Sequence, residues 1–198
     1  MALIKVIMDQ QLQLWIKKIR KGDKKAFEKL FLKFYDSLCN FAWRYVRSSY
    51  IAEELVQDAF LAVWESRDEL DTKKNIKTYL YQIVRNKALN HLKHQEIAEK
   101  HNTHIEWLNS ATISQIHDFE EDSDFIEAAQ RAIEDLPERA LQVYKLNRKD
   151  GLTYKEIAEV LDISPRTVES QISRALKKLK QNLSEYLSSG SSLHLKGK

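Results

Sequence analysis

Apolar residues recur three or four positions apart in three stretches of the first half of the chain, the spacing of the buried face of a helix. They are Leu30, Phe34, Leu38 and Phe41 in the first stretch, Leu55, Ala59 and Val63 in the second, and Leu80, Val84, Ala88 and Leu92 in the third. The pattern predicts three amphipathic helices. The second carries residues 53–64 and is capped by Ser49 or a neighbour, and the third runs over 76–93. Together they predict a compact helical bundle over residues 23–95.

A second periodic block covers residues 125–187. The segment between the blocks, 96–124, has few apolar residues and is acidic at its end, so we interpret it as a linker. Residues 1–22 form an N-terminal helical extension, and the Ser/Gly-rich tail 188–198 is expected to be disordered. Four Gly and two Pro in 198 residues leave few tight turns for a sheet. The sequence therefore predicts an all-α protein with two small helical domains joined by a flexible linker.

The second block contains a helix-turn-helix pattern over residues 153–179. Thr153 and Glu156 are three apart and form a capping box for a short helix. Asp162 lies in the turn, where Gly is common, and Asp tolerates left-handed backbone. Ser164, followed by a proline, is a natural N-cap for the second helix. These signals occur in the order that two helices joined by a tight turn require.

Polar and basic side chains occupy one face of the second helix, opposite an apolar stripe. The stripe consists of Val168, Ile172, Ala175 and Leu179. Early residues of a recognition helix reach base edges in the major groove, and later cations contact phosphates. The helix-turn-helix proper runs from Tyr154 to Ser173. The candidate DNA-binding residues lie in it and directly after it: they are Arg166, Thr167, Glu169, Ser170, Ser173, Arg174 and Lys177. The net charge of the whole chain, +3, is too small to indicate nucleic-acid binding by itself. The distribution of charge is more informative, because residues 166–180 hold five basic residues and one acidic residue.

A helical block followed by a helix-turn-helix block resembles the short extracytoplasmic-function (ECF) sigma factors of bacterial RNA polymerase. Residues 132–179, with Leu-Pro-Glu-Arg near their start, resemble region four of these factors. In the first block, residues 22–27 resemble the opening of region two, 52–64 its polymerase-binding helix and 79–92 its promoter-melting helix. The resemblance implies a protein that binds core RNA polymerase, recognises the minus-ten and minus-thirty-five elements of promoter DNA, helps to melt it and directs transcription initiation. It also implies an anti-sigma factor as a possible partner.

The helix that carries residues 54–67 has acidic side chains on the face opposite its apolar stripe. A leucine exposed among acids suits docking on a partner surface, and the resemblance assigns this face to a coiled coil of the polymerase clamp. The candidate polymerase-binding residues are Glu54, Gln57, Asp58, Leu61 and Glu65.

Lysines and arginines alternate with Asn and Tyr between residues 72 and 93. Proteins bind single-stranded DNA with such a mixture, because cations follow the phosphates while aromatic and amide groups contact bases. A base leaves the duplex at a cost of a few kcal/mol and needs a preformed pocket. The candidate minus-ten residues are Thr72, Lys73, Lys74, Asn75, Tyr79, Arg85, Asn86, Lys87 and Asn90. Tyr79 and Tyr81 could instead be buried in the helical core, as aromatic residues of helices often are. The resemblance implies that the loop 72–75 sets promoter choice.

No pattern of residues indicates catalysis. There is no Gly-rich phosphate loop and no opposed carboxylate pair, so we expect no enzyme activity, catalytic residue or cofactor. Four histidines form two pairs at three-residue spacing, but we expect no metal site because no cysteine lies nearby. The paired histidines are His91, His94, His101 and His104. Cys39 is the only cysteine and is expected to be a buried thiol.

The apolar runs of the chain are all shorter than a membrane span of about 20 residues. The start also lacks a signal-peptide pattern, so we expect a cytoplasmic protein without membrane insertion. Two other classes of function remain open. A LuxR-type regulator has a similar Leu-Thr-x-x-Glu-Ile-Ala output helix, as at 152–158, but its front domain is usually α/β. A nucleic-acid enzyme with a targeting helix-turn-helix would need a catalytic constellation.

Overall fold

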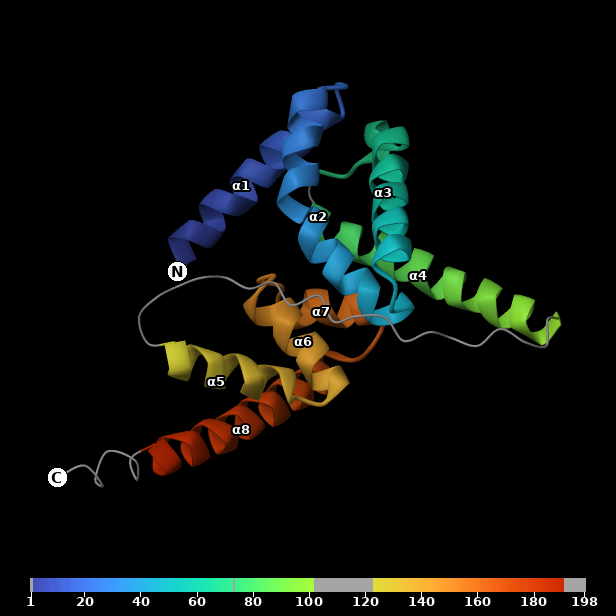
Figure 1. Ribbon diagram of the computed structural model, residues 1–198. Coiled ribbons are helices and arrows are strands. Elements are labelled where there is room, and N and C mark those ends of the chain that lie inside the picture. The colour runs from blue at the N-terminus through green and yellow to red at the C-terminus, as the bar shows by residue number, and fades with distance from the viewer. Residues whose placement is uncertain (1, 73, 102–122, 191–198) are drawn as a thin grey trace. The chain divides into compact units, whose positions relative to one another are not determined.

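The computed structural model describes residues 2–72, 74–101 and 123–190, and all regular structure in these ranges is helical (Figure 1). The helices are α1 (Ala2–Ile19), α2 (Lys24–Val46), α3 (Ser49–Glu65), the short 3-10 helix η1 (Arg67–Glu69), α4 (Ile76–His101), α5 (Ser123–Glu134), α6 (Glu138–Arg148), α7 (Tyr154–Leu161) and α8 (Pro165–Gly190). The chain divides into two compact units, the first containing α1–α4 and the second α5–α8. The all-α expectation with two helical domains is confirmed.

Two helices are longer than the sequence predicted. α4 continues to His101, through the first six residues of the expected linker, because residues 96–101 contain good helix formers and neither Gly nor Pro. α8 continues to Gly190, so the first three residues of the expected disordered tail are helical. Residues 123 and 124, the last two of the expected linker, already belong to α5, which begins at Ser123. Residues 102–122 of the linker and the tail residues 191–198 lie outside the described part of the chain.

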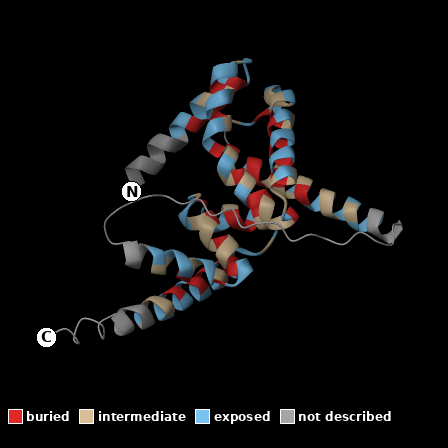
Figure 2. Cartoon of the chain, in the orientation of Figure 1, coloured by how far each residue is buried: buried red, intermediate tan, exposed pale blue. Residues whose placement is uncertain are grey.

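The apolar faces of α2, α3 and α4 pack together and form the core of the first unit (Figure 2). The residues of the three predicted stripes are buried, except Leu92, which is half-buried near the far end of α4. α3 begins at the cap Ser48, whose Oγ accepts a hydrogen bond from the Ile51 N–H over 3.4 Å. The predicted cap at Ser49 or a neighbour is therefore Ser48.

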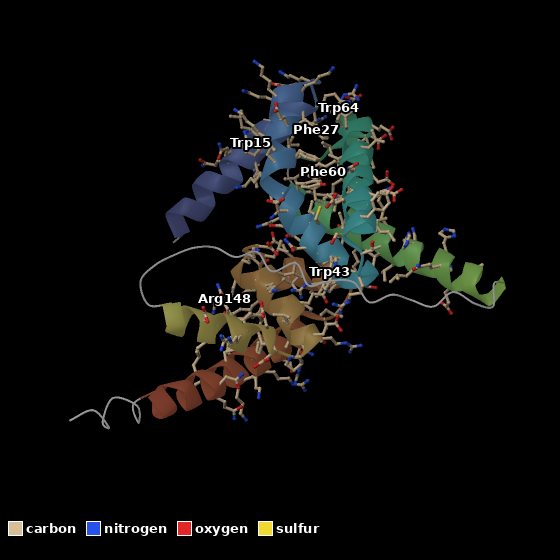
Figure 3. The ribbon with its side chains drawn as sticks, in the orientation of Figure 1. Trp15, Phe27, Trp43, Phe60, Trp64 and Arg148 are labelled. Atoms are coloured by element: carbon tan, nitrogen blue, oxygen red, sulfur yellow. The ribbon has the colours of Figure 1, made fainter. Side chains whose placement is uncertain are left out.

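Aromatic rings interlock α2 with α3 (Figure 3). The Phe27 ring centroid lies 5.0 Å from that of Trp64 and 6.0 Å from that of Phe60. Phe31 contributes a second ring against Phe60, with centroids 4.8 Å apart. Edge-to-face and tilted pairs of this kind add about 0.5–1.5 kcal/mol each beyond the burial of their area. They hold α3 firmly on α2, so the outer face of α3 is presented by a rigid element.

α1 packs against α2 through one apolar stripe. Leu12, Ile16 and Ile19 follow one another at helical spacing and are all buried. The chain turns into α2 at Gly22, whose φ of +82° is a conformation that glycine adopts without strain. Asp23 then caps α2, with its Oδ1 accepting a hydrogen bond from the Ala26 N–H over 3.0 Å.

In the second unit, α8 contacts each of the other three helices. Its predicted apolar stripe, formed by Val168, Ile172, Ala175 and Leu179, is buried throughout. Two of the residues that face α8 are small: Ala132 and Ala140 join Leu136 in a cluster around its buried part. Small residues at a helix crossing let the backbones approach closely, which fixes α8 on the unit and leaves its opposite face outward. Among the described residues, none of the helices combines the length and apolarity that a membrane span requires.

Candidate nucleic-acid and polymerase interfaces

The helix-turn-helix of the second unit forms as the sequence predicted. Thr153 and Glu156 make the capping box, since the Thr153 N–H donates to Glu156 Oε2 over 2.7 Å and the Glu156 N–H donates to Thr153 Oγ1 over 3.3 Å. α7 ends where Asp162 adopts the left-handed region, with φ 54° and ψ 52°. The N–H groups of Asp162 and Ile163 both donate to the Ala158 carbonyl oxygen. These bonds close the turn and set the direction in which α8 departs.

Two hydroxyl groups meet at the beginning of α8. Ser164 Oγ accepts a hydrogen bond from the Thr167 N–H over 3.0 Å, which confirms Ser164 as the N-cap. The hydroxyl groups of Ser164 and Thr167 are also 2.8 Å apart and share a hydrogen bond. Thr167, which the sequence indicated as a DNA contact, thus has a capping role that the sequence analysis missed.

The outer face of α8, opposite its buried stripe, is polar and exposed. We call the α8 face the exposed set Arg166, Glu169, Ser170, Ser173, Arg174, Lys177 and Lys178. Arg166, Ser170, Ser173 and Lys177 follow one another at helical spacing along its centre. A helix with this face outward can lie in the major groove with its first turns at the base edges and its later cations at phosphates.

The connection from α6 to α7 depends on Asn147, which the sequence analysis did not single out. Its side-chain amide donates to the Leu152 carbonyl oxygen over 2.9 Å, and the Leu152 N–H donates to the Leu146 carbonyl oxygen over 3.0 Å. Gly151 turns the chain there with a φ of +66°. The glycine before the capping box was the available sequence signal for this turn, whereas nothing local identifies Asn147 as its partner.

The first unit brings the predicted polymerase-binding residues together on α3. Positions 54, 58, 61 and 65 follow at intervals of four, three and four residues, so they share one side of the helix. All are exposed, as is Gln57 beside them. Leu61 is 54% exposed in the middle of these polar neighbours. We call Glu54, Gln57, Asp58, Leu61 and Glu65 the α3 face.

The exposed side of α4 carries three of the predicted minus-ten residues. Tyr79, Asn86 and Asn90 follow at intervals of seven and four residues and are all exposed; we call them the α4 face. Tyr81, by contrast, is fully buried, and its ring meets that of Phe41 edge to face with centroids 5.0 Å apart. Of the two tyrosines for which a core role was left open, Tyr81 is therefore the one that belongs to the core, and Tyr79 is exposed. Arg85 and Lys87 are half-buried at the edges of the α4 face.

The loop before α4 contains the remaining predicted minus-ten residues. Thr72 is half-buried, Lys74 and Asn75 are exposed, and Lys73 lies outside the described residues. The Asn75 Oδ1 accepts a hydrogen bond from the Lys77 N–H over 3.0 Å. Asn75 therefore caps the first turn of α4, a role that the sequence analysis missed although Asn is a common N-cap.

Cysteine and histidine are among the side-chain types of the first unit that could serve as a nucleophile or a metal ligand. Cys39 is half-buried rather than buried, and burial raises the pKa of its thiol from 9.0 to about 11. A thiol with a raised pKa is a poor nucleophile at neutral pH. No three His, Cys, Asp or Glu side chains gather as metal ligands in the part of the chain that the structure describes, and His104 falls outside it.

Comparison with known proteins connects both units to transcription. The model for Sigma-70 region 2 matches residues 30–96, and the model for Sigma-70, region 4 matches residues 126–179. The ECF RNA polymerase sigma-E factor of Escherichia coli (strain K12) is 30% identical over 182 residues, which cover 85% of this chain and 93% of that protein. The chain belongs to the ECF sigma factors. The RNA polymerase sigma-H factor of Pseudomonas aeruginosa is 28% identical to this sigma factor over 194 residues, covering 90% and 95% of the two chains.

Solved structures support the fold of the sigma factor. CnrH, in a complex with the cytosolic domain of CnrY, has a TM-score of 0.55 and 20% identity, covering 88% of this chain and 98% of that chain. The sigma factor RpoE of Bartonella quintana, in a complex with the anti-sigma factor NepR, has a TM-score of 0.55 and 24% identity, covering 81% and 98%. At these identities the likeness shows a shared fold.

Membership of the family gives the function. The protein binds core RNA polymerase, recognises the minus-thirty-five and minus-ten promoter elements, assists promoter melting and directs transcription initiation. Sigma factors are initiation factors and not enzymes. The LuxR-type alternative finds no support, because the described part of the first unit is helical and matches sigma region two where that class usually has an α/β domain.

Proposed function

We propose that the α8 face is the surface with which this sigma factor recognises the minus-thirty-five element. Arg166, Ser170 and Ser173 reach base edges, since Arg bonds guanine bidentately and Ser bonds several bases. Glu169 accepts a hydrogen bond from cytosine. Arg174 and Lys177 lie further along the helix and hold phosphates, which position the protein without reading sequence. The observation that carries this assignment is the exposure of all these side chains opposite a fully buried stripe on α8.

The minus-ten element is assigned to the α4 face together with the loop 72–75. The amides of Asn86 and Asn90 and the ring of Tyr79 line one exposed side of a helix, where unstacked bases can pack and form hydrogen bonds. Arg85 and Lys87 lie at the edges of this side, in positions suited to the phosphates of the melted strand. The cations Lys73 and Lys74 supply further charge in the loop.

The α3 face is assigned to core RNA polymerase. Leu61 supplies apolar area, and the surrounding carboxylates supply a negative rim that steers association with a basic partner. The rings of Phe27, Phe60 and Trp64 hold this helix in place, which keeps the docking surface preorganised. We also assign the protein to the cytoplasm, where polymerase and chromosome meet, with no catalytic activity of its own and with an anti-sigma factor as regulator.

In-vitro transcription with core RNA polymerase and genomic template tests the assignment as a whole. The full-length protein is expected to form a complex with core and to give promoter-specific transcripts. Variants of the α8 face should lose the preference for the minus-thirty-five sequence while retaining the complex with core RNA polymerase. If they lose the complex with core instead, the two surfaces are misassigned.

A further inference from the structure

α1 and the loop before α4 border an open cleft of about 180 Å³ in the first unit. α1 contributes one wall, and the loop with the first residue of α4 contributes the other. The lining residues are Leu12, Gln13, Ile16, Thr72, Lys74, Asn75 and Ile76. α1 lies ahead of the segment that matches sigma region two, which begins at residue 30. The region-two model therefore does not extend over this wall of the cleft.

The lining combines an apolar base with a polar rim. Leu12, Ile16 and Ile76 are buried, whereas Gln13 is exposed on the side of α1 that borders the cleft. A base taken out of the stack is held in this way, with apolar contact on its faces and hydrogen bonds on its edge. The Gln13 amide offers both a donor and an acceptor for such an edge. The volume is smaller than the ~300 Å³ at which pockets for whole small-molecule ligands begin, so it suits a single ring system.

A line of cations leads away from Gln13 along α1. Lys17 and Arg20 follow it at intervals of four and three residues, on the same side of the helix, and both are exposed. Further exposed lysines continue around the corner into α2: they are Lys21, Lys24 and Lys25. The acid among them, Asp23, uses its carboxylate to cap α2. A polar pocket at the end of a cationic track is the arrangement with which proteins hold single-stranded nucleic acid.

We propose that Gln13 is a specificity-determining residue for one base of the melted minus-ten element, and that Lys17 and Arg20 hold the phosphates next to that base. The proposal rests on the proposed function in one respect, because the loop 72–75 must lie at the minus-ten element. α1 then forms part of the promoter-reading surface in addition to supporting α2.

Selection from a promoter library with randomised minus-ten positions tests the role of Gln13. Holoenzyme made from core polymerase and full-length sigma factor transcribes the library, and the templates of the transcripts are sequenced. Gln13→Ala is expected to relax the preference at one minus-ten position by about tenfold. Gln13→Glu should shift that preference toward cytosine, which donates to a carboxylate. A purely structural role of Gln13 would not change the identity of the preferred base.

Gln11→Ala is the matched control, because Gln11 is an exposed glutamine of the same helix and does not line the cleft. Its preference profile should equal that of the wild-type protein. The proposal is overturned if both Gln13 variants retain the wild-type preference at every minus-ten position. A wild-type holoenzyme that gives no promoter-specific transcript would refute the proposed function itself, before any variant is compared.

The cations are tested by the salt dependence of open-complex formation. Each lost contact with a phosphate of single-stranded DNA lowers the slope of the logarithm of the binding constant against the logarithm of the salt concentration by about 0.7. Lys17→Ala combined with Arg20→Ala should therefore lower the slope by more than one, whereas Lys18→Ala, on the other side of α1, should leave it unchanged. Equal slopes for the double variant and the wild-type protein would contradict the phosphate role.

Discussion

Lys87 on α4 donates a hydrogen bond to Asp58 on α3, with 3.2 Å between Nζ and Oδ2. The two side chains are 31% and 54% exposed, so the pair lies at the surface of the first unit. Asp58 belongs to the α3 face, which we assign to polymerase, and Lys87 borders the α4 face, which we assign to DNA. The pair therefore joins the two proposed surfaces by a direct contact.

Loss of Lys87 is expected to affect both surfaces. Lys87→Ala removes a cation beside the DNA and leaves Asp58 without this partner, so affinity for core polymerase should change along with promoter opening. The coupling free energy between Asp58→Ala and Lys87→Ala in a double-mutant cycle should be about 0.2–1 kcal/mol, as for other exposed pairs. Fluorescence anisotropy with labelled sigma factor measures the affinity for core. Asn90→Ala, which removes no such partner, should alter promoter opening and leave the affinity for core unchanged.

Leu61 is expected to be central to core binding. Leu61→Glu places a charge where the partner surface should be apolar, so the affinity for core polymerase should fall at least tenfold without loss of helix content. Leu32→Glu is the matched control, since Leu32 is an exposed leucine of α2 outside the α3 face. The affinities of the two variants are measured by their competition with labelled wild-type sigma factor for a limiting amount of core polymerase. Equal losses for the two variants would mean that the α3 face is not the docking surface.

Arg174 and Lys177 are expected to contact phosphates rather than bases. Arg174→Ala and Lys177→Ala should each weaken holoenzyme binding to minus-thirty-five duplexes almost uniformly across sequences and lower the salt slope by about one. Titrations at several salt concentrations measure the slope. Lys149→Ala, an exposed lysine after α6, serves as control. A change of preferred sequence with an unaltered slope would instead assign these residues to bases.

The left-handed backbone at Asp162 predicts how this turn responds to substitution. Asp162→Val should destabilise the turn by about 1–2 kcal/mol because a β-branched residue is strained at a φ of 54°. Asp162→Gly should be tolerated. Native-state hydrogen exchange of amides in α7 and α8 gives a local free energy of opening. Lys149→Val is a suitable control because Lys149 also follows a helix but has right-handed backbone, with φ −83° and ψ −46°.

The thiol of Cys39 is expected to react slowly in the folded protein. Burial raises its pKa from 9.0 to about 11, and below both values each pKa unit reduces the thiolate fraction tenfold. The greater nucleophilicity of a thiolate of higher pKa offsets part of this loss, so at pH 8 alkylation by iodoacetamide should be about tenfold slower in the native protein than in urea. Mass spectrometry gives a clean rate because Cys39 is the only cysteine. Since the folded pKa is the higher one, the stability that burial of the neutral thiol contributes is present below about pH 9 and is lost as the pH rises toward 11. Similar alkylation rates in both states would show that the thiol is not shielded.

Features that depend on residues three or four apart were predictable from the sequence. The capping box at Thr153, the left-handed turn at Asp162 and the buried stripe of α8 all formed as expected, because each is decided by neighbours along the same helix or turn. The same holds for the exposed Leu61. The end of α4 was predicted too early, since a polar helix that extends beyond its bundle shows no apolar stripe for periodicity to detect.

The sequence by itself determined the helical elements, their order and the family, because helix periodicity and caps are local and the motifs of both units are continuous in the chain. Only the tertiary structure decided which of Tyr79 and Tyr81 enters the core, that Asp58 pairs with Lys87, and that α1 forms a cleft with the loop before α4. These relationships join residues of different helices. They depend on how α2, α3 and α4 rotate to bury their apolar faces, and on where α1 settles against them, which no single segment encodes.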